Sequence, residues 1–193
     1  MTVKIWPARR YDNVSIALHW LTGLALMGQI VFGFLLDELA PRGTPARAYV
    51  INLHKSCGVV LGVAILVRLL WRWRHRPPAW PLSMKPRQQR AARLGHWALY
   101  GCMLVMPLTG YVASNFSKYG IRFFGHSWPA WGPASSTVYS FFNGLHVATA
   151  WLFSILIIGH AAVALKHAWV DRDGVFARIW PGASDPVSPR SSP

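Results

Sequence analysis

Apolar residues gather in four long stretches, separated by segments rich in arginine, proline and glycine. The stretches cover residues 15–36, 49–71, 94–113 and 137–169, each near the ~20 residues that a membrane-spanning helix needs. Pro107 lies inside the third stretch and predicts a kink, because proline cannot donate the helical hydrogen bond. The pattern predicts an all-α integral membrane protein, a four-helix bundle of up-down-up-down topology.

Composition agrees with this interpretation and changes the meaning of the charge. Hydrophobic residues make up 53% of the 193-residue chain and charged residues 13%, a balance that favours a membrane protein. A net charge of +14 would suggest nucleic acid in a soluble protein. The basic residues lie between the apolar stretches, so we expect them to face lipid headgroups and expect no nucleic-acid partner. Residues 1–181 are expected to form one domain, and residues 182–193, rich in Ser and Pro, a disordered tail.

Basic residues are unevenly distributed over the predicted loops. Segment 72–93 contains seven Lys or Arg and no acid, whereas segment 37–47 balances two acids against two arginines. Segment 114–136 has only Lys118 and Arg122 as basic residues. The positive-inside rule therefore predicts that the 72–93 loop and both termini are cytoplasmic. The long, aromatic-rich 114–136 loop is expected to lie on the outer bilayer surface or to cap the bundle there.

Histidines inside the apolar stretches are the candidate chemistry. His146 and His160 are 14 residues apart, so on a helix they share one face and lie about 21 Å apart along the axis. Imidazoles inside a membrane helix are costly to place and usually functional. Counting depth along each stretch puts His54 level with His146 in the outer half, and His19 level with His160 in the cytoplasmic half. His167 in place of His160 would stretch the spacing to about 31 Å, which fits less well.

Two facing imidazoles in a bundle core favour haem over zinc. Zinc normally takes four ligands, often cysteine or carboxylate, and no carboxylate lies inside the four stretches. Haem needs two axial ligands and an apolar slot, which helix bundles provide. Small residues near the histidines would let a flat macrocycle approach the backbone: Gly23, Gly58, Gly62 and Gly159. The alternative is a set of buried histidines that are simply hydrogen-bonded to their neighbours.

Several short motifs occur in a fixed order along the chain: Leu18-His19-Trp20, Leu53-His54-Lys55-Ser56, Val67-Arg68-Leu69-Leu70, Leu94-Gly95-His96 and Pro107-Leu108-Thr109-Gly110. With His146 and His160, this set resembles the bacterial cytochrome b561 family over residues 10–181. The resemblance implies a multi-pass inner-membrane protein with two haem b groups that exchanges electrons with quinone. The axial ligands of the family match the four histidines selected by depth, His19, His54, His146 and His160.

Within the family, the chain resembles the stand-alone superoxide oxidase type most. That resemblance implies an oxidoreductase that passes electrons from superoxide at the outer side to ubiquinone bound towards the cytoplasm. A histidine seven residues after the last ligand lies near the quinone in this type and matches His167. A lysine of the basic loop is also implicated, for which Lys85 is a candidate. The alternative is a cytochrome b subunit that anchors a hydrogenase or another dehydrogenase to the quinone pool.

Other polar residues near the predicted pairs keep alternative interpretations. His96 is either a partner for a haem propionate or quinone carbonyl or an interfacial histidine in contact with water. His167 has the same interfacial alternative. Lys55 and Arg68 are candidates to pair with propionates or with lipid phosphates. For the whole protein, a non-redox transporter or scaffold is a distant alternative, and the lack of intramembrane carboxylates argues against a proton-coupled transporter.

Overall fold

Four long helices form the protein, as the apolar pattern predicts. The computed structural model describes residues 10–81 and 84–183. The long helices are α1 (Asn13–Phe34), α3 (Ala46–Arg74), α4 (Pro86–Asn115) and α5 (Ser136–Lys166). Each is long and apolar enough to cross a membrane, α5 together with the segment that continues it. The prediction of an all-α membrane bundle is confirmed, and the structure adds the short helix α2 (Leu36–Leu39) and a small hairpin.

Local signals set where the helices begin and bend. Asp12 caps α1, because its carboxylate accepts a hydrogen bond from the Ser15 backbone N–H at 2.8 Å. Helix α4 begins at Pro86, well before the predicted apolar start at Leu94. Proline suits the first helical position, where its missing N–H costs nothing. The last part of the predicted 72–93 loop is therefore helical and forms the polar start of α4. Pro107 lies inside α4, as expected.

A two-stranded antiparallel hairpin interrupts the loop between α4 and α5. Strands β1 (Ile121–Phe123) and β2 (His126–Trp128) pair with Phe123 opposite His126. The two turn residues, Phe124 and Gly125, have positive φ angles of 46° and 94°. Positive φ angles at both turn residues give a turn whose twist matches the right-handed twist of the two paired strands.

Helix α3 holds this hairpin by hydrogen bonds from one buried serine. The Ser56 hydroxyl accepts from the Phe124 N–H at 2.9 Å, and its one proton lies between the Asn52 carbonyl at 2.7 Å and the Arg122 carbonyl at 3.2 Å. Lys55 adds a hydrogen bond from Nζ to the Gly120 carbonyl at 3.2 Å. The hairpin therefore caps the bundle beside His54, one of the two positions that the sequence left open for this loop.

Helix packing is uneven around the bundle. Helix α4 packs extensively on α5, α1 on α3, and α3 on α4, whereas α1 and α3 make few close backbone approaches to α5 in the described part of the chain. Buried apolar residues of all four helices form the core: Leu26, Ile30, Leu61, Ile65, Cys102, Met103, Met106, Ala150 and Phe153. A seam between α5 and the α1–α3 pair therefore runs along the bundle.

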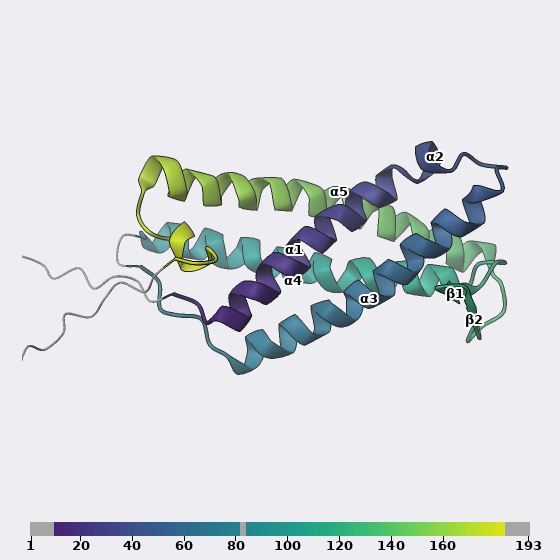
Figure 1. The fold of residues 1–193 in the computed structure, drawn as a ribbon, viewed down its shortest axis with the longest axis horizontal. Helices are drawn as coiled ribbons and strands as arrows, with labels where there is room; N and C mark the ends of the chain where they lie inside the picture. The colour runs from purple at the N-terminus through teal and green to yellow at the C-terminus, as the bar shows by residue number, and fades with distance from the viewer. Residues whose placement is uncertain (1–9, 82–83, 184–193) are drawn as a thin grey trace, which may run out of the picture.

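The two ends of the bundle differ. Figure 1 shows the start of α1, the α3–α4 connection and the C-terminal segment at one end, called here the termini end. Helix α2 and the β1–β2 hairpin lie at the other end, called the hairpin end. Residues 1–9 and most of the predicted tail 182–193 lie outside the described residues. The described chain thus starts and stops at one end, as four antiparallel crossings require.

After α5 the chain continues into the π-helical segment η1 (His167–Asp171) and the 3-10 helix η2 (Phe176–Arg178). This segment folds back onto the start of α1, where the Trp20 indole N–H donates to the Ile179 carbonyl at 2.8 Å. Arg178 is buried and donates to the Ala79 carbonyl at 2.8 Å. The C-terminal segment is therefore tied both to α1 and to the α3–α4 connection.

Candidate functional site

Four histidines from three helices form two facing pairs along the seam. At the hairpin end, His54 of α3 faces His146 of α5 with ring centroids 6.4 Å apart. At the termini end, His19 of α1 faces His160 of α5 with ring centroids 6.3 Å apart. All four rings are half-buried. These are the hairpin-end pair and the termini-end pair, and they join the same residues that the depth argument paired.

The centroid separations fit one metal between the rings of each pair. A metal–imidazole bond is about 2 Å long, and the centroid of an imidazole lies about 1 Å from each nitrogen. Two imidazoles on opposite sides of one iron therefore place their centroids about 6 Å apart. Direct hydrogen bonding between the rings would bring them closer. The pairs thus have the spacing that a bis-imidazole haem needs.

A haem would also need a place for a flat ligand between the helices that carry each pair. Both pairs cross from α5 to α1 or α3, the helices to which α5 makes few close backbone approaches. Both pairs lie within the long apolar helices, and Arg68 and His96 adjoin the termini-end pair. The donor set and the packing therefore fit haem better than they fit a four-ligand zinc site.

His146 is held in one orientation by α4. Its Nδ1–H donates to the Met106 backbone carbonyl at 2.9 Å. The other ring nitrogen, Nε2, then keeps a free lone pair. A metal would therefore bind His146 through Nε2. Gly110 makes this placement possible, because a Cβ atom there would lie 2.9 Å from Cε1 and 3.0 Å from Nδ1 of the His146 ring.

His54 is contacted by Gln29 of α1, whose amide nitrogen can only donate, so His54 Nδ1 accepts in this contact. Gln29 donates from its amide to the His54 backbone carbonyl at 2.7 Å and lies 3.2 Å from the ring Nδ1. Gly33 lies under the ring, where an added Cβ would approach His54 Cε1 to 3.1 Å. Gln29, Gly33 and the Met106 carbonyl were missed in the sequence, because which helix faces which histidine depends on tertiary packing.

The termini-end pair has a cation beside it. Arg68 lies with one guanidinium nitrogen 3.0 Å from His19 Nδ1 and donates from the other to the Thr22 hydroxyl at 2.7 Å. A guanidinium can only donate, so His19 Nδ1 accepts in this contact. Metal binding through Nε2 would instead leave the proton on Nδ1. Arg68 must then turn away from the ring, which makes it available to a carboxylate such as a propionate.

A third histidine belongs to the termini end. His96 of α4 has its ring centroid 5.4 Å from that of His160 and its Nδ1 2.6 Å from the Ala92 carbonyl. The His96 side chain is exposed, whereas the pair beside it is half-buried. The structure therefore places His96 at the exposed edge of the termini-end pair.

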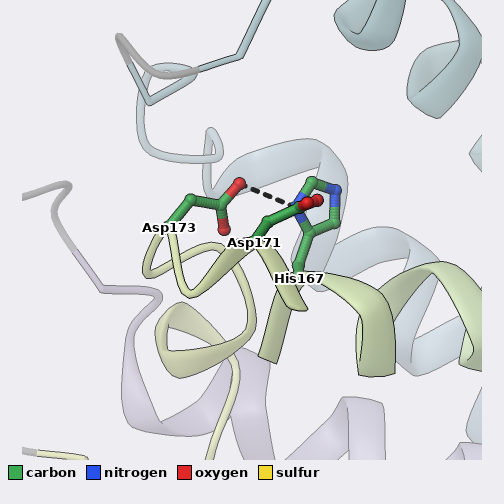
Figure 2. A group of neighbouring side chains, drawn as sticks. All are labelled: His167, Asp171 and Asp173. Carbon is green, nitrogen blue, oxygen red and sulfur yellow. Dashed lines mark hydrogen bonds and ion pairs between the residues drawn. The ribbon is translucent and has the colours of Figure 1, made fainter. Parts of the chain in front are cut away.

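The other predicted site residues are spread over both ends. Lys55 lies under the hairpin and is half-buried, whereas Lys85 is exposed at the start of α4. His167 is buried at the end of α5, where its Nδ1 donates to Asp173 Oδ2 at 2.7 Å (Figure 2). Asp173 was missed in the sequence, although an acid in an Asp-Gly turn just after His167 was a usable signal.

The glycines proposed as approach points divide into two groups. Added Cβ atoms at Gly23 and Gly159 would meet nothing within 4 Å, so no described residue packs against these two positions. Gly58 instead faces Gln29, and Gly62 faces Pro107 at 3.3 Å, so these two serve packing between helices.

Comparison with known proteins agrees with this geometry. A family model described as prokaryotic cytochrome b561 matches residues 10–182. The chain is 33% identical to cytochrome b561 homolog 2 of Escherichia coli K12, over 88% of this chain and 90% of that protein. It is 26% identical to cytochrome b561 homolog 1 of the same organism, over 89% and 97% of the two chains. It is 27% identical to the probable superoxide oxidase CybB of Yersinia pestis, over 90% and 97%. The chain therefore belongs to the prokaryotic cytochrome b561 family, a family of membrane electron-transfer proteins that bind haem b.

Proposed function

We propose that this protein binds two haem b groups and passes electrons through the membrane from superoxide to ubiquinone. The observation that carries the proposal is the presence of two imidazole pairs, at 6.4 Å and 6.3 Å, near opposite ends of one bundle. His54 and His146 would hold one haem, and His19 and His160 the other. Bound haem iron carries one electron at a time.

The direction of transfer follows from the charge asymmetry of the two ends. The Lys/Arg excess near the α3–α4 connection favours a cytoplasmic termini end and an outer hairpin end in the bacterial inner membrane. A reporter fused after Pro193 should then be active in the cytoplasm. A periplasmic signal would reverse the direction and exchange the roles of the two pairs.

Residues at the hairpin end suit an anionic donor. Five basic residues lie there against two acids, and Asp37 is already paired with Arg47 at 2.6 Å. Lys55 is held at the hairpin beside His54. A basic rim attracts superoxide and should do so less at high salt. Each superoxide gives up one electron and leaves as O₂.

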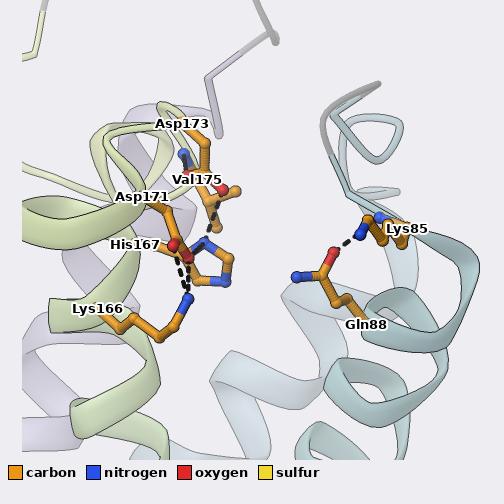
Figure 3. A network of polar contacts seen from close by, with 7 residues as sticks. All are labelled: Lys85, Gln88, Lys166, His167, Asp171, Asp173 and Val175. Atoms are coloured by element: carbon orange, nitrogen blue, oxygen red, sulfur yellow. Dashed lines mark hydrogen bonds and ion pairs between the residues drawn. The ribbon is translucent and has the colours of Figure 1, made fainter.

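Residues at the termini end suit the quinone. Reduction of ubiquinone to quinol needs two electrons and two protons, and histidines are suited to proton transfer near neutral pH. His96 and His167 both lie at this end, and Figure 3 draws Lys85 and Gln88 of α4 across from His167. We assign the quinone to the region between the end of α5 and the start of α4.

The test is a stopped-flow experiment on the purified haem-loaded protein. Superoxide should reduce the haem absorption bands, and short-chain ubiquinone should then reoxidise them. Haems that stay oxidised in superoxide but are reduced by a co-expressed dehydrogenase would favour the subunit function instead. A purified protein without haem absorption bands would contradict both the superoxide oxidase function and the subunit function, and a non-redox function would remain.

A further inference from the structure

The His167 side chain is a buried titratable group outside the two histidine pairs. It is 7% exposed, and its Nδ1 lies 2.7 Å from Asp173 Oδ2. An ionised carboxylate can only accept, so the proton of this hydrogen bond belongs to Nδ1. Nε2 is then the nitrogen that can exchange protons with another molecule. In Figure 3 the Nε2 edge of the ring is turned towards Gln88 and Lys85 of α4.

The backbone around Asp173 is shaped to hold its carboxylate under this ring. The second oxygen, Oδ1, accepts from the Val175 N–H at 3.2 Å. Arg172 and Gly174 on either side have positive φ angles of 49° and 80°. The left-handed conformation at Arg172 is unfavourable for a residue with a side chain, so the surrounding structure must enforce it. The C-terminal segment is in turn anchored on α1 through Trp20.

Asp171 lies nearby but is already neutralised. Its Oδ2 is 3.5 Å from His167 Nδ1, beyond hydrogen-bond distance for a good contact. Lys166 donates from Nζ to both oxygens of Asp171. His167, Asp171 and Asp173 could in principle share a metal ion, but the ammonium of Lys166 already occupies the Asp171 carboxylate. Asp173 therefore provides the negative charge that the His167 ring experiences.

We propose that Asp173 is a positioning residue that holds His167 with its Nδ1 protonated, so that Nε2 delivers a proton to the quinone. This inference rests on the proposed function. Two electrons from two superoxide ions and two protons from the cytoplasmic side convert the quinone to quinol. His167 would give the proton on Nε2 to a quinone oxygen and regain one from water. While Nε2 is protonated the ring is cationic, and the Asp173 carboxylate stabilises it, as in other His–Asp pairs.

The decisive substitution is Asp173→Asn in the haem-loaded protein. An asparagine amide fits the same space but would donate a hydrogen bond to Nδ1. The ring proton would then lie on Nε2, and Nε2 could not accept a second proton. Reduction by superoxide should be unchanged, and reoxidation by short-chain ubiquinone should slow about tenfold or more. The loss should fall on kcat with little change in KM for the quinone, and Asp173→Glu should recover part of the rate.

Asp171→Asn is the matched control, because it removes the neighbouring acid that Lys166 neutralises. It should change reoxidation by less than about twofold, as expected for an exposed ion pair. A second control is Asp173→Asn combined with His167→Gln. If Asp173 acts through His167, the double variant should be no slower than His167→Gln alone.

The outcomes separate this inference from the function on which it rests. If the wild-type haems are not reoxidised by quinone, the proposed function fails whatever Asp173 does. Should wild type be reoxidised and Asp173→Asn match its rate, the inference is wrong and the function stands. Additional slowing of the His167→Gln protein by Asp173→Asn would also overturn it, because Asp173 would then act independently of His167.

Discussion

The hairpin-end and termini-end pairs have nearly the same ring separation but different surroundings. His54 and His146 are held by neutral groups, an amide and a backbone carbonyl, over two glycines that leave room for the rings. His19 instead lies against the guanidinium of Arg68, and His96 adds a third imidazole beside His160. The hairpin-end pair therefore has neutral neighbours, whereas the termini-end pair has a cation and a third imidazole beside it.

This difference suits two sites in series. An entry site for single electrons needs a well-defined ligand geometry, which orienting hydrogen bonds provide. An exit site to a two-electron, two-proton acceptor also needs groups that move protons and balance charge. Substitutions and salt should therefore affect the two sites differently.

Removing a ligand should have the largest effect. His54→Ala or His146→Ala should remove the hairpin-end haem alone, and His19→Ala or His160→Ala the termini-end haem alone. Each change deletes one of two axial ligands and opens a hole in the seam. The measurement is haem per protein together with the absorption spectrum of each variant.

The matched control for this prediction is His167→Ala. It should keep both haems, since His167 is bonded to Asp173 rather than paired across the seam. Loss of a haem in His167→Ala, with both retained in His160→Ala, would transfer the ligand role to His167.

Gly110→Ala should weaken the hairpin-end haem without deleting a ligand. The new methyl would lie 2.9 Å from His146 Cε1, so the ring must shift and its hydrogen bond to the Met106 carbonyl must break. Overpacking of this kind costs about 1–3 kcal/mol, which corresponds to roughly 5- to 150-fold in haem affinity. The measurement is the fraction of haem that each variant retains during competition with apomyoglobin, which reports the change in haem affinity.

Gly101→Ala is the control on the same helix, because a Cβ there would meet nothing within 4 Å. Alanine favours helix over glycine at both positions, so helix propensity cannot explain a loss. Equal haem retention in Gly101→Ala and Gly110→Ala would show that the hairpin-end pair does not need the close approach.

Arg68→Met should shift the redox potential of the termini-end haem and leave the other unchanged. A nearby positive charge favours the reduced iron, so its removal should lower the potential. A partly screened charge contributes about 1 kcal/mol, or roughly 40 mV for one electron. A potentiometric titration followed at the haem bands measures this shift.

Arg68→Lys keeps the charge and should shift the potential less than Arg68→Met does. An equal shift in both variants would assign the effect to packing or hydrogen bonding rather than charge. A shift in the hairpin-end haem would contradict the placement of Arg68 at the termini-end pair.

The smallest effect concerns salt. Raising the ionic strength should slow haem reduction by superoxide a few fold, because the basic rim of the hairpin end is screened. Reoxidation by neutral ubiquinone should not change. If haem reduction and haem reoxidation depend equally on salt, the basic residues of the hairpin end do not attract superoxide specifically.

The sequence predicted the parts of this fold that depend on local pattern. Span lengths follow from runs of apolar residues, and the pairing of His54 with His146 follows from depth along each helix. Orienting groups could not be predicted in this way. Whether Gly110 or the Met106 carbonyl meets His146 depends on the rotation of α4 about its axis, which its weakly amphipathic sequence does not fix.

The hairpin and the C-terminal segment show the same limit. Phe124-Gly125 is a weaker turn signal than Asn-Gly, so the sequence indicated only a long loop. The contact of Asp173 with His167 arises because the chain reverses after η1, and such a reversal leaves little trace in hydrophobic pattern. The surroundings of His167 are therefore the part of the molecule that the sequence alone described least.

The central claim is that each histidine pair holds one haem. The direct measurement is the haem-to-protein ratio of the purified wild-type protein, with low-temperature electron paramagnetic resonance of its oxidised form. The account predicts two haems per chain, both low-spin as two imidazole ligands require. One haem per chain, or a high-spin signal of a haem with one ligand, would contradict it.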